Sequence, residues 1–152
     1  FGVHDVLVEV VTKRIKETIP TFAKHTAIVL MAHGTPTPTA NAPIYTVARR
    51  LESTLQAPVR VAFMECNEPT ISEAMDAFVK EGFETIINAP YFLHSGSHVQ
   101  EDLPQIMREA KEKYAGLEFL LTGHLGYDES FAIIIQEKFM QSEVNRQKLE
   151  SA

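Results

Sequence analysis

Cysteine and basic residues are scarce in this chain of 152 residues, and tryptophan is absent. The single cysteine, Cys66, excludes an internal disulfide framework and is typical of a reducing cytoplasm. Fourteen Lys and Arg against twenty Asp and Glu give a net charge of −6, which argues against nucleic acid as a partner because phosphate binding needs clustered cations. No apolar run approaches the roughly 20 residues of a membrane-spanning helix. We expect a cytoplasmic protein without a signal peptide that binds neither nucleic acid nor membrane.

Signature motifs of several enzyme classes are also missing. The chain has no P-loop and no GxGxxG segment, so nucleotide binding has no local support. It has no GxSxG segment either, which leaves a serine hydrolase without its nucleophile. What the chain does have is 45% hydrophobic and 22% charged residues, a composition typical of one soluble globular domain.

Four short apolar runs alternate with segments of helical periodicity. The runs are residues 26–32, 59–64, 85–93 and 117–122. Helices are predicted at residues 5–19, 44–55, 71–78, 103–114 and 127–139. Runs this rich in Val, Ile, Leu and Phe indicate strands buried on both faces of a parallel sheet. The alternation therefore predicts an open α/β sheet of about four parallel strands, with an extra helix before the first strand.

This pattern divides the chain into three parts. Residues 1–25 form an N-terminal helical extension, residues 26–140 an α/β domain, and residues 141–152 a polar C-terminal tail that we expect to fray. The apolar stripe of the extension must pack somewhere, and a dimer interface is one possible place.

Residues that can bind metal follow three of the predicted strands. They are His33, Glu65, His94 and His98. With the strand order 2-1-3-4, all of them share the carboxyl edge of the sheet, where open α/β sheets bind their ligands. Two imidazoles and a carboxylate suit Fe²⁺, Co²⁺, Ni²⁺ or Zn²⁺. From the spacing alone, a metal or catalytic site and a set of unrelated surface residues are about equally good interpretations.

Ordinary structural explanations also exist for these residues. An acid such as Glu65 is most often a solvated loop residue. A histidine after a strand is often a cap or loop residue, the interpretation that we prefer for His124. Cys66 is read as a small buried side chain rather than a soft ligand.

Four segments of the chain resemble the successive blocks of the small CbiX-type sirohydrochlorin chelatases. They read IVLMAHGTPTPTAN, VRVAFMECNEPTISEAM, INAPYFLHSGSHVQEDLP and GHLGYDESFAIII, and together extend from about Ala27 to Phe139. The block G-x-H-V-x-x-D-[LI]-P after a P-Y-F-L strand is the most specific. These class II chelatases insert Co²⁺, Fe²⁺ or Ni²⁺ into sirohydrochlorin, for cobalamin, sirohaem or related tetrapyrroles.

The resemblance implies a site, a fold and an assembly. It places the metal-binding and catalytic histidines at His33 and His98 and the acidic residue at Glu65. It implies a chelatase-like (flavodoxin-like) fold, a divalent metal as substrate, no organic cofactor, a tetrapyrrole partner and a homodimer.

The loop between the third strand and the next helix is expected to bind the macrocycle. Its residues are His94, Ser95, Gly96 and Ser97. Gly96 lets the backbone approach a flat ligand, and the serines supply hydrogen bonds. His94 has no regular counterpart in the family and is an extra ligand, a proton carrier or a contact to the macrocycle.

Three alternatives stay open. The chain is a non-catalytic metal or tetrapyrrole carrier on the same fold, or one half of a larger fused enzyme. The third alternative is a relationship to the protoporphyrin-type ferrochelatases, because the sequence Gly-Thr-Pro after the first strand also occurs in those enzymes.

Overall fold

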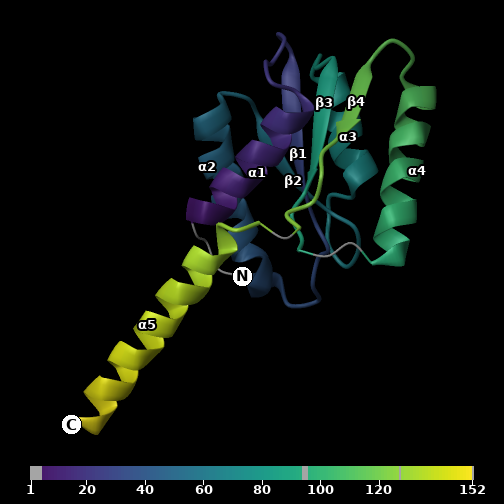
Figure 1. The fold of residues 1–152 in the computed structure, drawn as a ribbon. Helices are drawn as coiled ribbons and strands as arrows, with labels where there is room; N and C mark the ends of the chain where they lie inside the picture. Colours follow the sequence, from purple (N-terminus) through teal and green to yellow (C-terminus); the bar gives the residue numbers. More distant parts are fainter. Residues whose placement is uncertain (1–4, 94–95, 127, 152) are drawn as a thin grey trace.

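A four-stranded parallel sheet lies between two layers of helices in the computed structural model (Figure 1). The structure describes residues 5–93, 96–126 and 128–151, apart from the side chains of Pro38 and His98. The strands are β1 (Thr26–Ala32), β2 (Val59–Phe63), β3 (Thr85–Pro90) and β4 (Glu118–Leu121). The sheet order β2-β1-β3-β4 is the flavodoxin-like order assumed in placing the site residues at one edge.

Five α-helices and one short 3-10 helix connect and flank these strands within the described residues. They are α1 (Asp5–Thr18), η1 (Pro38–Asn41), α2 (Ala42–Leu55), α3 (Ile71–Lys80), α4 (Ser97–Lys113) and α5 (Phe131–Glu150). Among the described residues, no helix is both long enough and apolar enough to cross a membrane.

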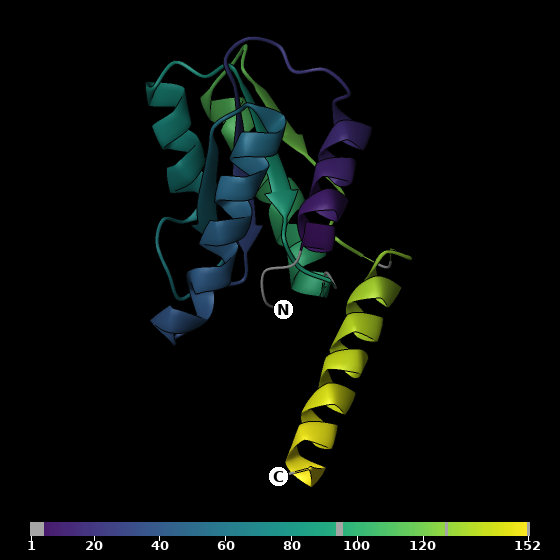
Figure 2. The ribbon, with the colours of Figure 1, turned by 90° about the vertical axis from the view of Figure 1, so that its left-hand side faces the viewer.

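Alternate residues of the central strand β1 enter two separate cores. Ile28 and Leu30 pack under α1 and α2, whereas Val29 and Met31 pack under α3 and α4. All four side chains are fully buried. Figures 1 and 2 show the resulting three layers, in which each face of the sheet has two covering helices. This double burial explains why β1 and β3 are nearly continuous apolar runs in the sequence.

Helix α1 is an integral part of this fold. Leu7, Val11 and Ile15 recur every four residues and are buried against the sheet of the same chain. The guanidinium of Arg14 donates hydrogen bonds to two backbone carbonyls after β4, those of His124 at 3.2 Å and Leu125 at 3.2 Å. The apolar stripe of α1 therefore packs inside its own chain, and the suggested placement at a dimer interface is wrong.

Two helices differ from their expected extents. Helix α4 begins at Ser97, six residues before the predicted stripe, because its first turn is mostly solvent-facing and lacks an apolar period. Helix α5 begins at Phe131 and runs without a break to Glu150, across the segment expected to be a frayed tail. The residue at its N-cap is Ser130, and the predicted cap Asp128 instead accepts the Ser130 backbone N–H at 3.0 Å.

Candidate functional site

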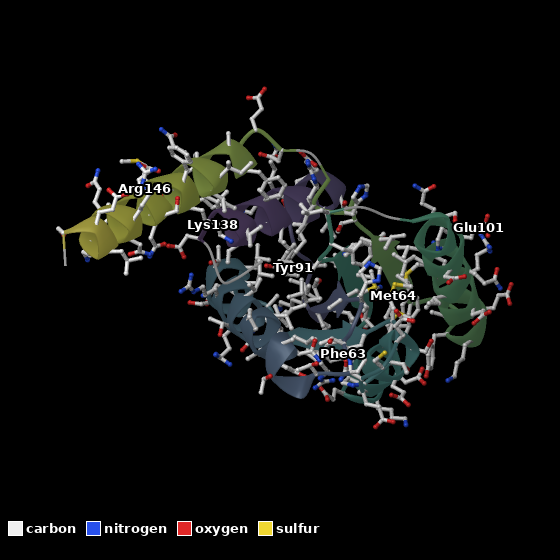
Figure 3. All side chains as sticks on the ribbon, turned by 90° about the horizontal axis from the view of Figure 1, so that it is seen from below. Phe63, Met64, Tyr91, Glu101, Lys138 and Arg146 are labelled. Carbon is white, nitrogen blue, oxygen red and sulfur yellow. The ribbon has the colours of Figure 1, made fainter. Side chains whose placement is uncertain are left out.

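The carboxyl ends of the central strands meet at one edge of the sheet, which faces the viewer in Figure 3. Backbone pairing continues past the ends of the strands. The N–H of Tyr91 donates to the Met31 carbonyl at 2.7 Å, and the N–H of Glu65 donates to the His33 carbonyl at 3.0 Å. The predicted residues His33 and Glu65 are thereby brought side by side, although 32 positions separate them in the chain.

The imidazole of His33 is exposed and lies against an aromatic ring. Its centroid is 4.6 Å from that of Phe92, with 39° between the ring planes. Phe92 is buried in the core under α3 and α4. The imidazole therefore has a firm apolar support on one side and remains accessible to solvent and to a ligand on the other.

Contacts between two loops fix the position of His33 relative to Glu65. Gly34 has φ +93°, and a Cβ atom at this position would lie 1.9 Å from the Glu65 carbonyl oxygen. Only glycine fits there. The side-chain oxygen of Asn67 accepts the Thr35 N–H at 2.7 Å and ties the same two loops together. The backbone thus holds the two candidate ligands in place, before any metal binds.

The loop after β2 presents its side chains to solvent. Glu65 and Cys66 are both exposed, and Cys66 has φ +66°. The expectation of a buried Cys66 is wrong, because the residue lies in a tight reversal in which the Asn67 N–H donates to the Glu65 carbonyl at 2.8 Å.

The third loop is described only in part. His94 and Ser95 lie outside the described residues, as does the side chain of His98, whose backbone belongs to the first turn of α4. Ser97 is exposed, and Gly96, the N-cap, has extended backbone angles. A Cβ atom at Gly96 would meet no described atom within 4 Å, so nothing in the described part of the chain requires glycine there.

No three His, Cys, Asp or Glu side chains among the described residues lie close enough together to hold a metal. His33 and Glu65 are the two predicted ligands that the described part of the chain contains. Their convergence with His98 stays a prediction.

Tyr91 is a polar residue at this edge that the sequence analysis missed. Its hydroxyl is buried and has no hydrogen-bond partner in the described part of the chain. Burial disfavours the phenolate and raises the pKa of Tyr91 to about 12. The only signal in the sequence is one tyrosine at the end of an apolar strand, in the PYFL block. Figure 3 shows Tyr91 near the middle of the edge.

Two hollows lie near these elements. One of about 240 Å³ is lined by Phe63, Met64, the first turn of α3, and Asp102, Gln105 and Ile106 of α4. It adjoins the loop that carries Glu65. A larger groove of about 520 Å³ runs between α1 and α2, and none of the predicted site residues that the structure describes lines it.

Comparison with protein families gives one match, to the CbiX family, over residues 27–142. A sirohydrochlorin cobaltochelatase from Priestia megaterium is 29% identical over 141 residues, which are 90% of this chain and 46% of that protein. A sirohydrochlorin cobaltochelatase from Methanococcus aeolicus is 37% identical over 82 residues, 53% of this chain and 57% of that protein. The chain thus spans about half the length of these curated relatives.

Solved structures share the fold. A CbiX protein from Marinobacter aquaeolei superposes with a TM-score of 0.65 and 21% identity, over 80% of this chain and 98% of that one. SirB from Bacillus subtilis, solved with Fe³⁺, has a TM-score of 0.70 and 19% identity, over 85% of this chain and 50% of that one. Both likenesses concern the arrangement of the sheet and its helices.

Proposed function

The chain belongs to the CbiX family, and we propose that it inserts Co²⁺ or Fe²⁺ into sirohydrochlorin. Ni²⁺ is a third metal that the same ligands accept. The metal is a substrate of this reaction, and no organic cofactor takes part. The active assembly in this proposal is a cytoplasmic dimer of two copies.

The pairing of His33 with Glu65 at the carboxyl edge is the observation that supports the proposal most directly. A metal-transfer site needs ligands that are in place before the ion arrives and that remain open to a flat macrocycle. The exposed imidazole, supported by Phe92, and the exposed side chain of Glu65, whose backbone pairs with that of His33, support both requirements. Helix α4 starts at the same edge and carries His98 in its first turn.

The reaction exchanges two protons for one ion. A divalent metal enters the ring, and the two pyrrole N–H protons leave, so the charge balances. His33 and His98 hold the ion on one face of the macrocycle, and as each imidazole releases the ion, its freed nitrogen accepts one of these protons. Glu65 orients a histidine or completes the coordination sphere. Few and mostly neutral ligands release the metal readily, which transfer requires.

The third loop is the proposed contact surface for the macrocycle. No described atom lies within 4 Å of a Cβ placed at Gly96, and Ser97 is exposed. Among the described residues no side chain caps the N-terminus of α4, and its first N–H groups are the donors that we expect to meet the carboxylates of a tetrapyrrole. His94 and Ser95 complete the proposed contact surface.

The test is a spectroscopic assay of metal insertion with matched histidine variants. Sirohydrochlorin is mixed with Co²⁺ or Fe²⁺, and the change in its absorption is followed with and without protein. We expect His33→Asn and His98→Asn each to lower kcat/KM at least about 100-fold, because asparagine cannot accept a proton near neutral pH.

His25→Asn is the control for the assay. His25 is exposed at the opposite edge of the sheet, immediately before β1, and its positive φ is one that asparagine tolerates. We expect its activity to equal that of wild type. Undiminished turnover in the His33→Asn/His98→Asn double variant would remove these residues from the chemistry.

A further inference from the structure

The segments that follow the strands at the carboxyl edge contain no lysine and no arginine. They are residues 33–41, 64–70, 91–96 and 122–130. Two cations of α1, Lys13 and Arg14, reach the last of these segments, where they pair with Asp128 at 3.1 Å and 3.6 Å. These segments therefore offer a ligand that carries carboxylates uncharged hydrogen-bond donors in place of lysine or arginine.

This composition suits the proposed reaction, on which the inference rests. A lysine or arginine beside the metal would repel an incoming divalent ion, whereas an amide N–H group binds a carboxylate without adding charge to the site. The same segments contain the acids Glu65, Glu68, Asp128 and Glu129. The macrocycle can lie in one position among these acids only if uncharged donors that are already in place hold its own carboxylates.

The side chain of Asn67 is fixed in the loop after β2. The residue lies two positions after Glu65 and is half-buried. Its side-chain oxygen accepts the Thr35 N–H at 2.7 Å and would lie 2.9 Å from a Cβ atom at Gly34. Because the Thr35 N–H can only donate, the oxygen of the amide must face it. The planar amide group then turns its nitrogen away from Thr35.

This nitrogen is available to a ligand. It has no hydrogen-bond partner among the described residues. It is also not one of the buried side-chain atoms that lack a partner in the described chain, so it is open to solvent. The oxygen alone ties the two loops together, and the two N–H groups of the amide are left over from the fold.

The position of Asn67 relative to the candidate ligands is fixed as well. Its backbone N–H donates to the Glu65 carbonyl at 2.8 Å, and the Glu65 N–H donates to the His33 carbonyl at 3.0 Å. Figure 3 shows Met64, at the start of the same loop, on the side of Tyr91 that faces α4. The free N–H groups are thus held at the edge to which His33 and Glu65 belong.

We propose that the side-chain amide of Asn67 binds a peripheral carboxylate of the tetrapyrrole, and so sets where the macrocycle lies relative to His33 and Glu65. Asn67 donates hydrogen bonds to the substrate and takes no part in the transfer of protons or metal. This inference deepens the proposed function by naming a residue that recognises the substrate.

The experiment compares two substitutions that each add one negative charge to the same loop. Asn67→Asp keeps an oxygen that accepts the Thr35 N–H and replaces the donating nitrogen by a charged oxygen. The control, Cys66→Asp, adds the charge at the neighbouring exposed residue and keeps the Asn67 amide; aspartate tolerates the positive φ of this position. Binding of metal-free sirohydrochlorin is measured by fluorescence titration, and urea unfolding verifies the fold.

We expect Asn67→Asp to raise the Kd of sirohydrochlorin at least about 10-fold, because a hydrogen bond to a carboxylate is replaced by repulsion between like charges. Cys66→Asp should raise it at most about 3-fold, because an exposed charge is screened by solvent. Both variants should keep the urea midpoint of wild type. Equal Kd values for wild type and Asn67→Asp would overturn the proposal, and so would equal losses in the two variants.

Metal insertion, assayed on the same samples, separates this inference from the proposed function. Binding that depends on Asn67 in a protein that inserts no metal supports the contact and contradicts the function. Insertion by wild type together with unweakened binding by Asn67→Asp supports the function and contradicts the contact. In an active protein the substitution should raise KM and change kcat less than about 3-fold; a fall in kcat alone would contradict a role in binding.

Discussion

Replacing Tyr91 by phenylalanine should stabilise the protein. The substitution keeps the aromatic ring, which packs against the core under α1 and α2, and removes only the buried hydroxyl. In the unfolded chain that hydroxyl bonds to water, whereas in the folded chain no described group accepts its proton. Leaving a buried donor unpaired costs about 1–3 kcal/mol, so we expect a gain of about 1 kcal/mol. For a chain of this length the gain corresponds to about 3 °C in Tm.

Two other tyrosines provide matched controls in the same thermal and urea unfolding assays. The hydroxyl of Tyr114 donates to a carboxylate oxygen of Asp76 at 2.6 Å, so Tyr114→Phe, which removes this hydrogen bond, should destabilise the protein. Tyr45 is 43% exposed, and Tyr45→Phe should change the free energy of unfolding by less than about 0.5 kcal/mol. Destabilisation by Tyr91→Phe equal to that by Tyr114→Phe would show that the Tyr91 hydroxyl is bonded, and the reasoning would fail.

The pH dependence gives a second readout. The pKa of Tyr91 is about 12 in the folded state against 10.0 for an ordinary tyrosine. Between these values the unfolded state loses its proton first, so the free energy of unfolding falls as pH rises from 10 to 12. The difference corresponds to at most roughly 3 kcal/mol. The stability of Tyr91→Phe should lack this part of the alkaline decline, and an identical decline in both proteins would contradict the burial argument.

Three further predictions concern a carboxylate and two glycines. Hydrogen bonds from Ser130 lower the pKa of Asp128 from 3.8 to about 2. The ionised Asp128 therefore stabilises the folded protein by at most roughly 2 kcal/mol. This contribution to the free energy of unfolding is present above pH 3.8 and is lost as pH falls to about 2. At pH 6 the Asp128→Asn variant should therefore unfold at a lower urea concentration than wild type. The difference between the two urea midpoints should be smaller at pH 3, and an equal difference at both pH values would refute this prediction. Gly34→Ala should cost at least about 3 kcal/mol or prevent folding, because its Cβ would overlap the Glu65 carbonyl. Gly96→Ala should leave Tm nearly unchanged and raise the KM for sirohydrochlorin; unaltered binding would show that the macrocycle does not approach this backbone.

The strands of the sheet follow from the sequence because burial on both faces leaves a clear pattern, whereas their order is taken from the common flavodoxin-like arrangement. A strand such as β1 shows an apolar residue at nearly every position, and the segments between such runs are long enough for crossover helices. The contact between His33 and Glu65 follows from the same pattern, since parallel strands place their carboxyl ends at one edge. The prediction of the strands depends only on local composition and chain length, and that of the contact depends also on the assumed order of the strands.

The surfaces that helices cover do not follow in this way. The stripe of α1 predicts a helix with an apolar side, but its spacing is the same whether that side meets its own sheet or a partner. The segment from 141 to 150 is polar in composition, yet it is helical, and the carboxylates of Glu143 and Glu150 lie within one turn of Arg146 and pair with it, which supports the helix. The composition of a segment therefore does not determine the surface against which the segment packs.

In the proposed function, the side of the sheet on which the metal would be inserted is set by the alternation of single residues at the end of β3. Tyr91 turns toward α1 and α2, and the next residue, Phe92, turns toward α3 and α4. Because the imidazole of His33 lies against Phe92, it belongs to the side that α4 covers, and His98 is part of α4. A shift of one residue would exchange these sides and separate the two histidines by the thickness of the sheet. Substitutions at His33 should therefore impair turnover without a large loss of stability, while Tyr91→Phe, on the opposite side, should change stability and leave turnover intact.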